Sequence, residues 1–121
     1  MKRALVTGAS GGIGAAIARR LARDGLHVIL HANQNPASAE AVSADIRAQG
    51  GSAEVVSFDV ADTDRCRVAL EQLLEHGPIQ VLVNNAGIHD DAPLAGMTPD
   101  QWKRVVDVSL NGFFNVTQPL L

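Results

Sequence analysis

The chain has 121 residues, which is enough for one domain with a hydrophobic core. Hydrophobic residues make up 46% of it and charged residues 19%, and these values exclude a disordered or fibrous chain. The formal net charge of −3 provides no strongly basic surface, so we expect no nucleic-acid partner.

Cysteine usage and the apolar runs indicate the compartment. The single cysteine, Cys66, cannot form an internal disulfide, and this favours a reducing, cytoplasmic environment. The apolar stretch at residues 4–6 is far too short for a signal peptide core or a membrane span. We therefore expect a cytoplasmic protein without a membrane partner.

In the first half of the chain, short apolar runs alternate with helical patterns. Strands are predicted at residues 3–7, 27–31 and 53–58. The helix after the first strand carries one apolar face and is stopped by Gly25. That face consists of Ile13, Ile17 and Leu21. The helix after the second strand has Asn35 as its N-cap and Pro36 at its first position.

The second half continues the alternation. Asp62 is expected to cap a helix that buries Cys66, and residues 81–83 form a fourth strand. Residues 98–101 then form a capping box with proline in the first turn of a long helix. Its predicted inward side, for packing rather than for ligand binding, carries Trp102, Val105, Val106, Ser109, Leu110, Phe113, Phe114 and Thr117.

This order of elements predicts an α/β fold: a Rossmann-type, doubly wound parallel sheet with helices on both faces. Right-handed crossovers give the strand order 3-2-1-4. Residues 81–83 are apolar on both faces, as in an interior strand, although they would form an edge. We therefore expect residues 1–121 to be the N-terminal part of a single dinucleotide-binding domain, truncated after strand 4 and its following helix.

A glycine-rich segment, Thr7 to Gly14, occupies the first turn from strand to helix. Its glycines let backbone N–H groups approach a pyrophosphate, which the N-terminus of the helix would face. A merely flexible loop is the alternative. The strand before the segment and the helix after it favour the binding loop.

The spacing Thr-Gly-x-x-x-Gly-x-Gly resembles that of the short-chain dehydrogenase/reductase family. Three later segments resemble the family as well. Asp59 and Val60 stand where the family has an acid that contacts adenine, and residues 84–87 match a motif that steadies the sheet and lines the cofactor site. Residues 107–115 resemble the helix that carries the family's active-site asparagine.

The end of the second strand bears on the choice of cofactor. A site that prefers NAD needs an acid there for the ribose 2′-OH, and this chain has no acid from His31 until Glu40. The sequence therefore favours NADP over NAD. Family members that prefer NADP often carry a basic residue at the positions of Gly11 or Asn33, and neither is basic here. Recognition of the 2′-phosphate would fall to neutral donors: Ser10, Asn33 and His31.

The cofactor-binding residues that follow from the glycine-rich turn, the end of the second strand and the resemblance form one set. They are Thr7, Gly8, Ser10, Gly11, Gly12, Ile13, Gly14, Asn33, Asp59, Val60, Asn85, Ala86 and Gly87. We expect no metal site: His89, Asp90 and Asp91 are adjacent, but neighbouring acids in a loop are more often solvated.

Within the family, residues 87–91 with Met97 and Trp102 are most similar to 3-oxoacyl-[acyl-carrier-protein] reductases. The resemblance implies an oxidoreductase of fatty acid biosynthesis that uses NADP(H) to reduce a ketone to a secondary alcohol, on a small-molecule or acyl-carrier-protein-bound substrate. It also implies a homotetramer when the protein is full length. A non-catalytic nucleotide-binding module, or a short-chain dehydrogenase for a sugar, a steroid or a simple alcohol, are the alternatives.

The family's chemistry uses a tyrosine as proton donor, with a lysine and a serine beside it. The chain contains no tyrosine, so we expect the 121 residues alone to be inactive. Aligning residues 107–112 with the family segment places Ser109 at the asparagine position and makes it the candidate catalytic residue. Asn111, two residues on, would point about 200° away around a regular helix. A space-filling role for Ser109 is the alternative.

Overall fold

The computed structural model of the chain describes residues 1–86 and 96–121. Its centre is a parallel sheet of β1 (Arg3–Val6), β2 (His27–Ala32), β3 (Ser52–Ser57) and β4 (Val81–Val83). The strand order is β3-β2-β1-β4, which confirms the predicted order, and Leu5 of β1 lies opposite Ile29 of β2 and Leu82 of β4. The ends of each predicted strand agree with the structure to within one residue.

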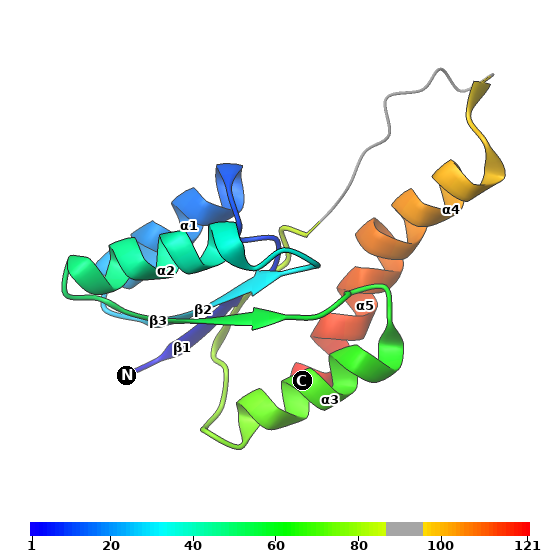
Figure 1. Cartoon of the computed structure of the whole chain (residues 1–121). Coiled ribbons are helices and arrows are strands. Elements are labelled where there is room, and N and C mark those ends of the chain that lie inside the picture. Colours follow the sequence, from blue (N-terminus) through cyan, green and yellow to red (C-terminus); the bar gives the residue numbers. More distant parts are fainter. Residues whose placement is uncertain (87–95) are drawn as a thin grey trace.

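Helices cover both faces of the sheet, as Figure 1 shows. One face carries α1 (Gly12–Arg23) and α2 (Ala37–Ala48), and the other carries α3 (Thr63–Leu74) and α5 (Gly112–Thr117). Because side chains alternate between the two faces of each strand, the core consists of two clusters, one on each face of the sheet. Val28 and Leu30 pack toward α1 and α2, whereas Leu5 and Ile29 pack with Cys66 on the side of α3 and α5. The doubly wound Rossmann-type architecture is therefore confirmed.

The inward face of α1 differs from the prediction. Its buried residues are small: Gly14, Ala15, Ala18 and Ala22. Ile13 is 73% exposed, so its assignment to the buried face was wrong. The helix begins at Gly12, which turns Ile13 outward in the first turn, and small side chains allow α1 to lie close to the sheet.

The predicted helix starts depend on local hydrogen bonds. Asp62 caps α3 by accepting the N–H of Arg65 at 3.0 Å, and Thr98 forms the expected capping box with Gln101 at the start of α4 (Pro99–Val106). The helix α2 begins at Ala37, so Pro36 lies at the cap rather than inside the helix. The Asn35 side chain still accepts the Ala37 N–H at 3.1 Å.

The last helix is interrupted by a π-helical turn, η2 (Asp107–Asn111), between α4 and α5. The N–H of Gly112 donates to the carbonyl of Asp107, five residues earlier. This wider turn changes the register of the two flanking helices, so they do not share the stripe expected from a regular helix. The residues of η2 and α5 that are buried are Val108, Gly112, Asn115 and Val116.

The predicted inward stripe of this helix was therefore wrong for its large side chains. Leu110 is 66% exposed, and Trp102, Phe113 and Phe114 are each more than half exposed. Gly112 allows the close contact instead, because a Cβ there would lie 2.8 Å from Cγ2 of Val60. A 3₁₀ turn, η3 (Gln118–Leu120), follows α5. Among the described residues, no helix is both long and apolar enough to cross a membrane.

Candidate cofactor site and catalytic position

Residues predicted for the site follow the carboxyl ends of all four strands. Thr7 follows β1, Asn33 follows β2, Asp59 lies two residues beyond β3, and Asn85 lies two residues beyond β4. Because the strands are parallel, these positions share one edge of the sheet, where open α/β sheets bind their ligands. The sequence motifs thus lie around one site.

The glycine-rich turn presents the N-terminus of α1 at this edge. Ala15 N–H donates to the Gly11 carbonyl at 3.3 Å, so the amides of residues 12–14 precede the first such bond of the helix. Gly12 has a φ of +58°, which is a left-handed conformation that favours glycine. Ser10, Gly11 and Gly12 are exposed, as is Ile13, and they form the outer lip of the turn. Amides in this arrangement fit an anionic diphosphate.

Thr7 supports the turn from beneath. Its side chain is buried, and its hydroxyl accepts the N–H of Asn85 at 3.0 Å and that of Ala86 at 2.9 Å. The same hydroxyl donates to the Val83 carbonyl. Thr7 therefore joins the ends of β1 and β4, and it acts on a ligand through the backbone that it positions.

Two glycines of the turn lie so close to neighbouring atoms that a side chain would not fit at either position. Gly8 has a φ of +64°, and a Cβ there would lie 3.0 Å from Cα of Ala86. A Cβ on Gly14 would clash with the Gly8 carbonyl and would lie 2.5 Å from Nδ2 of Asn85. That Asn85 amide donates to the Gly8 carbonyl at 2.9 Å. The backbone of the turn thus packs directly against the end of β4.

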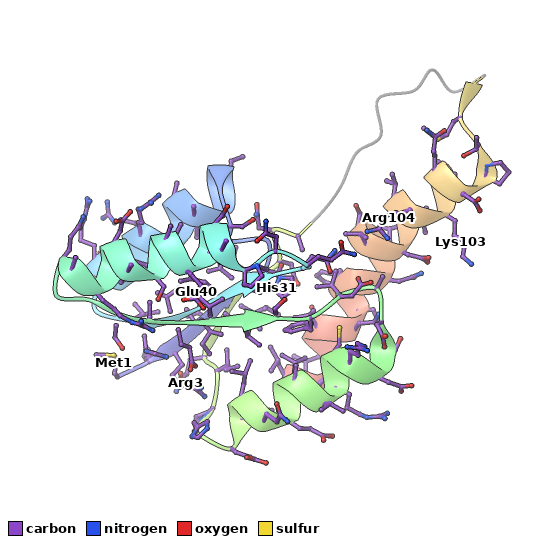
Figure 2. The ribbon with its side chains drawn as sticks, viewed as in Figure 1. Met1, Arg3, His31, Glu40, Lys103 and Arg104 are labelled. Carbon is purple, nitrogen blue, oxygen red and sulfur yellow. The ribbon has the colours of Figure 1, made fainter. Side chains whose placement is uncertain are left out.

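His31, at the carboxyl end of β2, is labelled in Figure 2. It is 1% exposed, and its Nδ1 accepts the Gly8 N–H at 3.1 Å while its Nε2–H donates to the Phe58 carbonyl at 2.7 Å. Burial lowers the pKa of the imidazole, against the opposing effects of the Phe58 carbonyl and the Asp59 carboxylate. The expectation that His31 donates to a 2′-phosphate was wrong, because both ring nitrogens are engaged inside the protein. The available signal was a polar residue directly after three consecutive apolar residues of the same strand.

The other predicted site residues after β2 and β3 are half-buried or buried. Asn33 is half-buried, and its Oδ1 has no hydrogen-bond partner among the described residues. Asp59 accepts the N–H of Ala61 at 2.9 Å, which shapes the loop into α3. Val60 is buried against Gly112. Asn33 thus has a buried side-chain oxygen, unpaired within the described residues, at the edge of the site, and Val60 fixes the position of α5.

Ser109 lies at the inner end of this edge. It lines a cavity of about 60 Å³ between the ends of β1 and β4 and the helix that contains η2. The other lining residues are Thr7, Val60, Asn84, Ala86, Val108, Gly112, Phe113 and Val116. Asn111 is exposed, and its amide donates to the Asp107 carboxylate at 2.9 Å. The structure therefore brings Ser109, and not Asn111, to the site. A catalytic role for Ser109 stays a prediction.

Asn115 was missed by the sequence analysis. It is buried, its amide donates to the Val60 carbonyl at 3.0 Å, and its Oδ1 accepts the Thr63 hydroxyl at 3.2 Å. These bonds attach α5 to the loop before α3 and so hold the wall of the cavity. The signal that could have identified Asn115 was a polar side chain one helical turn after Gly112.

Some predicted positions lie outside the described residues: Gly87 of the cofactor set, and His89, Asp90 and Asp91, which were weighed as metal ligands. Within residues 1–86 and 96–121, no three His, Cys, Asp or Glu side chains are grouped so that they could hold a metal ion.

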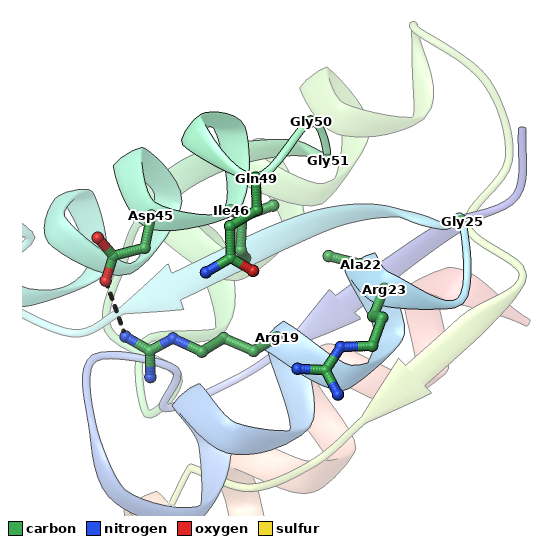
Figure 3. Close-up of a pocket in the computed structure, with 9 residues that line it drawn as sticks. All are labelled: Arg19, Ala22, Arg23, Gly25, Asp45, Ile46, Gln49, Gly50 and Gly51. Carbon is green, nitrogen blue, oxygen red and sulfur yellow. Dashed lines mark hydrogen bonds and ion pairs between the residues drawn. The ribbon is translucent and has the colours of Figure 1, made fainter.

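A larger hollow of about 310 Å³ lies between the C-terminal halves of α1 and α2 (Figure 3). Its lining residues are Arg19, Ala22, Arg23, Gly25, Asp45, Ile46, Gln49, Gly50 and Gly51. An ion pair of 3.2 Å between Arg19 and Asp45 joins the two helices there. Both helices direct their carbonyl ends toward this region, away from the glycine-rich turn, so it does not belong to the dinucleotide site.

A family model described as short chain dehydrogenase matches residues 2–121. The chain belongs to the short-chain dehydrogenase family, a family of oxidoreductases. It is 44% identical over 120 residues to an acetoacetyl-CoA reductase of Paracoccus denitrificans, covering 98% of this chain and 48% of that protein. It is 41% identical over 118 residues to a 3-oxoacyl-[acyl-carrier-protein] reductase of Staphylococcus aureus, covering 97% of this chain and 48% of the relative.

Solved structures agree with the fold. A gluconate 5-dehydrogenase from Burkholderia cenocepacia, in complex with NADP and tartrate, superposes with a TM-score of 0.89 at 38% identity, over 98% of this chain and 47% of that one. A metagenomic short-chain oxidoreductase in complex with NADP gives a TM-score of 0.93 at 38% identity, over 98% and 54%. The chain spans about half the length of the curated relatives it matches.

Proposed function

We propose that the whole protein is an NADP(H)-dependent reductase that converts a 3-oxoacyl thioester, carried by acyl carrier protein, into the secondary alcohol. The observation that carries the proposal is the arrangement at one sheet edge, where the open amides of α1 and the Ser109 cavity flank the ends of β1 and β4. The similarity to an acetoacetyl-CoA reductase and to a 3-oxoacyl-[acyl-carrier-protein] reductase supports the thioester substrate.

The described residues fit a dinucleotide. The amides of residues 12–14 would hold the pyrophosphate, Asp59 would lie toward the adenine, and residues 85–86 would line the path toward the nicotinamide end. The chemistry supplied by bound NADPH is a hydride for the ketone carbon. The chain's own part is to position this cofactor. Ser109, on the cavity wall, would hold a water of the proton relay through its carbonyl or hydroxyl oxygen.

The end of β2 supports NADP over NAD. Asn33 is neutral, so no carboxylate at this position repels a 2′-phosphate, and its side-chain amide N–H is the group that would donate to the phosphate. Ser10, exposed on the lip of the turn, is the second neutral donor. The NADP in two structurally similar proteins is consistent with this preference.

The proton donor is proposed to lie in the half of the relatives' length that this chain does not cover, because these 121 residues contain no tyrosine. We expect the whole protein to oxidise NADPH in the presence of acetoacetyl thioesters, and residues 1–121 alone to show no turnover. Comparable turnover by residues 1–121 would overturn the assignment of the donor. Cofactor binding by the whole protein without turnover of any carbonyl would favour a non-catalytic nucleotide-binding module.

A second substrate class has a specific observation in its favour, namely the structural similarity to a gluconate 5-dehydrogenase. The same assay therefore includes a keto-sugar acid with NADPH and the corresponding hydroxy acid with NADP. A higher kcat/KM for the sugar acids than for the thioester would replace the proposed substrate and leave the cofactor site as described.

We also propose that the whole protein is a homotetramer. The large exposed apolar side chains of the last helix supply a candidate contact surface: Trp102, Leu110, Phe113 and Phe114. Sedimentation of the whole protein tests the assembly, and a monomer at micromolar concentration would contradict it.

A further inference from the structure

His31 joins the ends of three strands beneath the glycine-rich turn. It lies in β2, its Nδ1 accepts from Gly8 after β1, and its Nε2–H donates to Phe58 after β3. The ring also lies against the Phe58 ring, with a centroid distance of 4.4 Å. Gly8 is held on its other side by Asn85, which donates to its carbonyl. The peptide groups of Gly8 are thus fixed from β2 and from β4.

We infer that His31, in its neutral form, is a positioning residue for the cofactor site: it holds the Gly8 N–H so that the first amides of α1 face the ligand. This inference rests on the proposed function, because the ligand in question is the dinucleotide. His31 itself is buried and does not contact that ligand.

The protonation state determines whether this bond exists. In the neutral ring, Nε2 carries the hydrogen for the Phe58 carbonyl, and Nδ1 keeps the lone pair that accepts from Gly8. A second proton would sit on Nδ1 and face the Gly8 N–H, so that two donors would oppose each other. The turn would then have to move away, and cofactor affinity would fall in acid.

The charged group that acts on the ring is Asp59, at the end of β3. The neighbouring positions after β1 and along β2 and β3 carry no titratable side chains: Thr7, Gly8, Ala9, Leu30, Ala32, Val56, Ser57 and Phe58. Glu40, in the first turn of α2, is exposed to solvent. Asp59 favours the protonated ring, but burial of the imidazole has the larger effect and keeps the ring neutral near pH 7.

Two amide substitutions separate the two hydrogen bonds. In His31→Asn, the side-chain oxygen replaces Nδ1 and can still accept from Gly8. In His31→Gln, the amide nitrogen reaches the position of Nε2 and can still donate to Phe58, whereas the Gly8 N–H loses its acceptor. The two variants have similar polarity and cannot be protonated near neutral pH.

NADPH binding by the whole protein is measured by calorimetry at pH 7.5 and at lower pH, below the pKa of His31. We expect His31→Gln to weaken binding about tenfold at pH 7.5, since it leaves the partly buried Gly8 N–H without its acceptor, and His31→Asn to stay near wild type. At a pH where NMR shows that the His31 ring is protonated, the wild type is expected to lose affinity more than His31→Asn does. Equal affinities of the two variants at pH 7.5, or equal loss of affinity by His31→Asn and the wild type at that lower pH, would overturn the inference.

Hydrogen exchange of the Gly8 amide, followed by NMR without cofactor, provides a second readout. Its protection should persist in His31→Asn and be lost in His31→Gln. In the wild type it should fall as the ring is protonated. If NADPH does not bind the wild type, the proposed function fails while the exchange rates still decide the His31–Gly8 bond. If the variants do not fold, the pH dependence of wild-type Gly8 protection decides it, and constant protection would refute the inference.

Discussion

Asn85 donates a 2.9 Å hydrogen bond to the carbonyl oxygen of Gly8, although the two residues are 77 positions apart in the sequence. This bond places the loop after β4 against the turn after β1. Thr7 adds two further bonds between the same segments, through its hydroxyl oxygen. The geometry of the glycine-rich turn is therefore set jointly by both strands, and substitutions at this junction should affect cofactor binding and folding together.

Gly14→Ala tests the close contact at the junction. The added Cβ would clash with the Gly8 carbonyl and with Nδ2 of Asn85, so backbone would have to shift. We expect a loss of about 1–3 kcal/mol in the free energy of unfolding, together with weaker NADPH binding. Urea unfolding of the whole protein measures the first effect and calorimetry the second.

Gly11→Ala is the matched control for stability. Gly11 is extended, with a φ of −179°, and a Cβ there would meet no atom of the described residues within 4 Å. Its free energy of unfolding should change by less than about 1 kcal/mol. Equal destabilisation by the two substitutions would mean that the contact between Gly14 and Asn85 is not tight in solution.

The cofactor preference is tested by Asn33→Asp, which changes the charge with little change of shape. A carboxylate at this half-buried position would repel a 2′-phosphate and could accept from the ribose hydroxyls of NADH. We expect the ratio of kcat/KM for NADPH to that for NADH to fall by about tenfold or more. Steady-state kinetics with both cofactors measure the ratio.

Gln49→Glu is the control for net charge, since it adds a carboxylate at the far end of α2. The cofactor ratio should stay at its wild-type value in this variant. A wild-type enzyme that prefers NADH, or an unchanged ratio in Asn33→Asp, would contradict the role given to the end of β2.

The catalytic position is tested by the pair Asn111→Ala and Ser109→Asn. Asn111 is exposed and bonded to Asp107, so its loss should change kcat little. Ser109 lines the cavity beside Thr7, and we expect the longer amide to be tolerated there with activity retained. Turnover assays, with circular dichroism to check folding, measure both. A large fall of kcat in folded Asn111→Ala would make Asn111 the catalytic residue instead.

Cys66 should be unreactive in the folded protein. Its side chain is buried, its thiol lies 3.4 Å from the Asp59 carbonyl, and burial raises its pKa to about 11. At pH 8 roughly one thiol in a thousand would then be ionised, so alkylation should be at least about a hundredfold slower than in urea. Mass spectrometry of the peptide that contains Cys66 measures the rate. Labelling as fast as in urea would show that α3 opens readily.

The strand order and the site edge could be predicted because they depend on local signals. Apolar runs define the strands, and Gly25, Asp62 and Thr98 mark helix ends through bonds within a few residues of each position. Residues that follow parallel strands must then meet at one edge, whatever the details of packing. This reasoning places Thr7 and Asn33 at the site without knowledge of any contact between them.

The orientation of side chains could not be predicted as well, because it depends on contacts between distant segments. The π turn at residues 107–111 moves Phe113 and Phe114 off the stripe that a regular helix would give them. The burial of His31 depends on Gly8 and Phe58, which the sequence places 23 and 27 residues away from it. The spacing of apolar residues predicts a helical period, but it does not show where a π turn interrupts that period.

The position of β4 at the end of the sheet has a consequence for thermodynamic linkage. In the described part of the chain, β4 pairs with β1 on one side, and its three residues are only half-buried. A strand that added to its outer side would restrain Asn85, and with it the glycine-rich turn. Thermodynamic reciprocity then requires that a dinucleotide bound at the turn stabilise the pairing of that strand with β4 by the same free energy. The affinity for the ligand and the stability of this strand pairing would therefore rise or fall together.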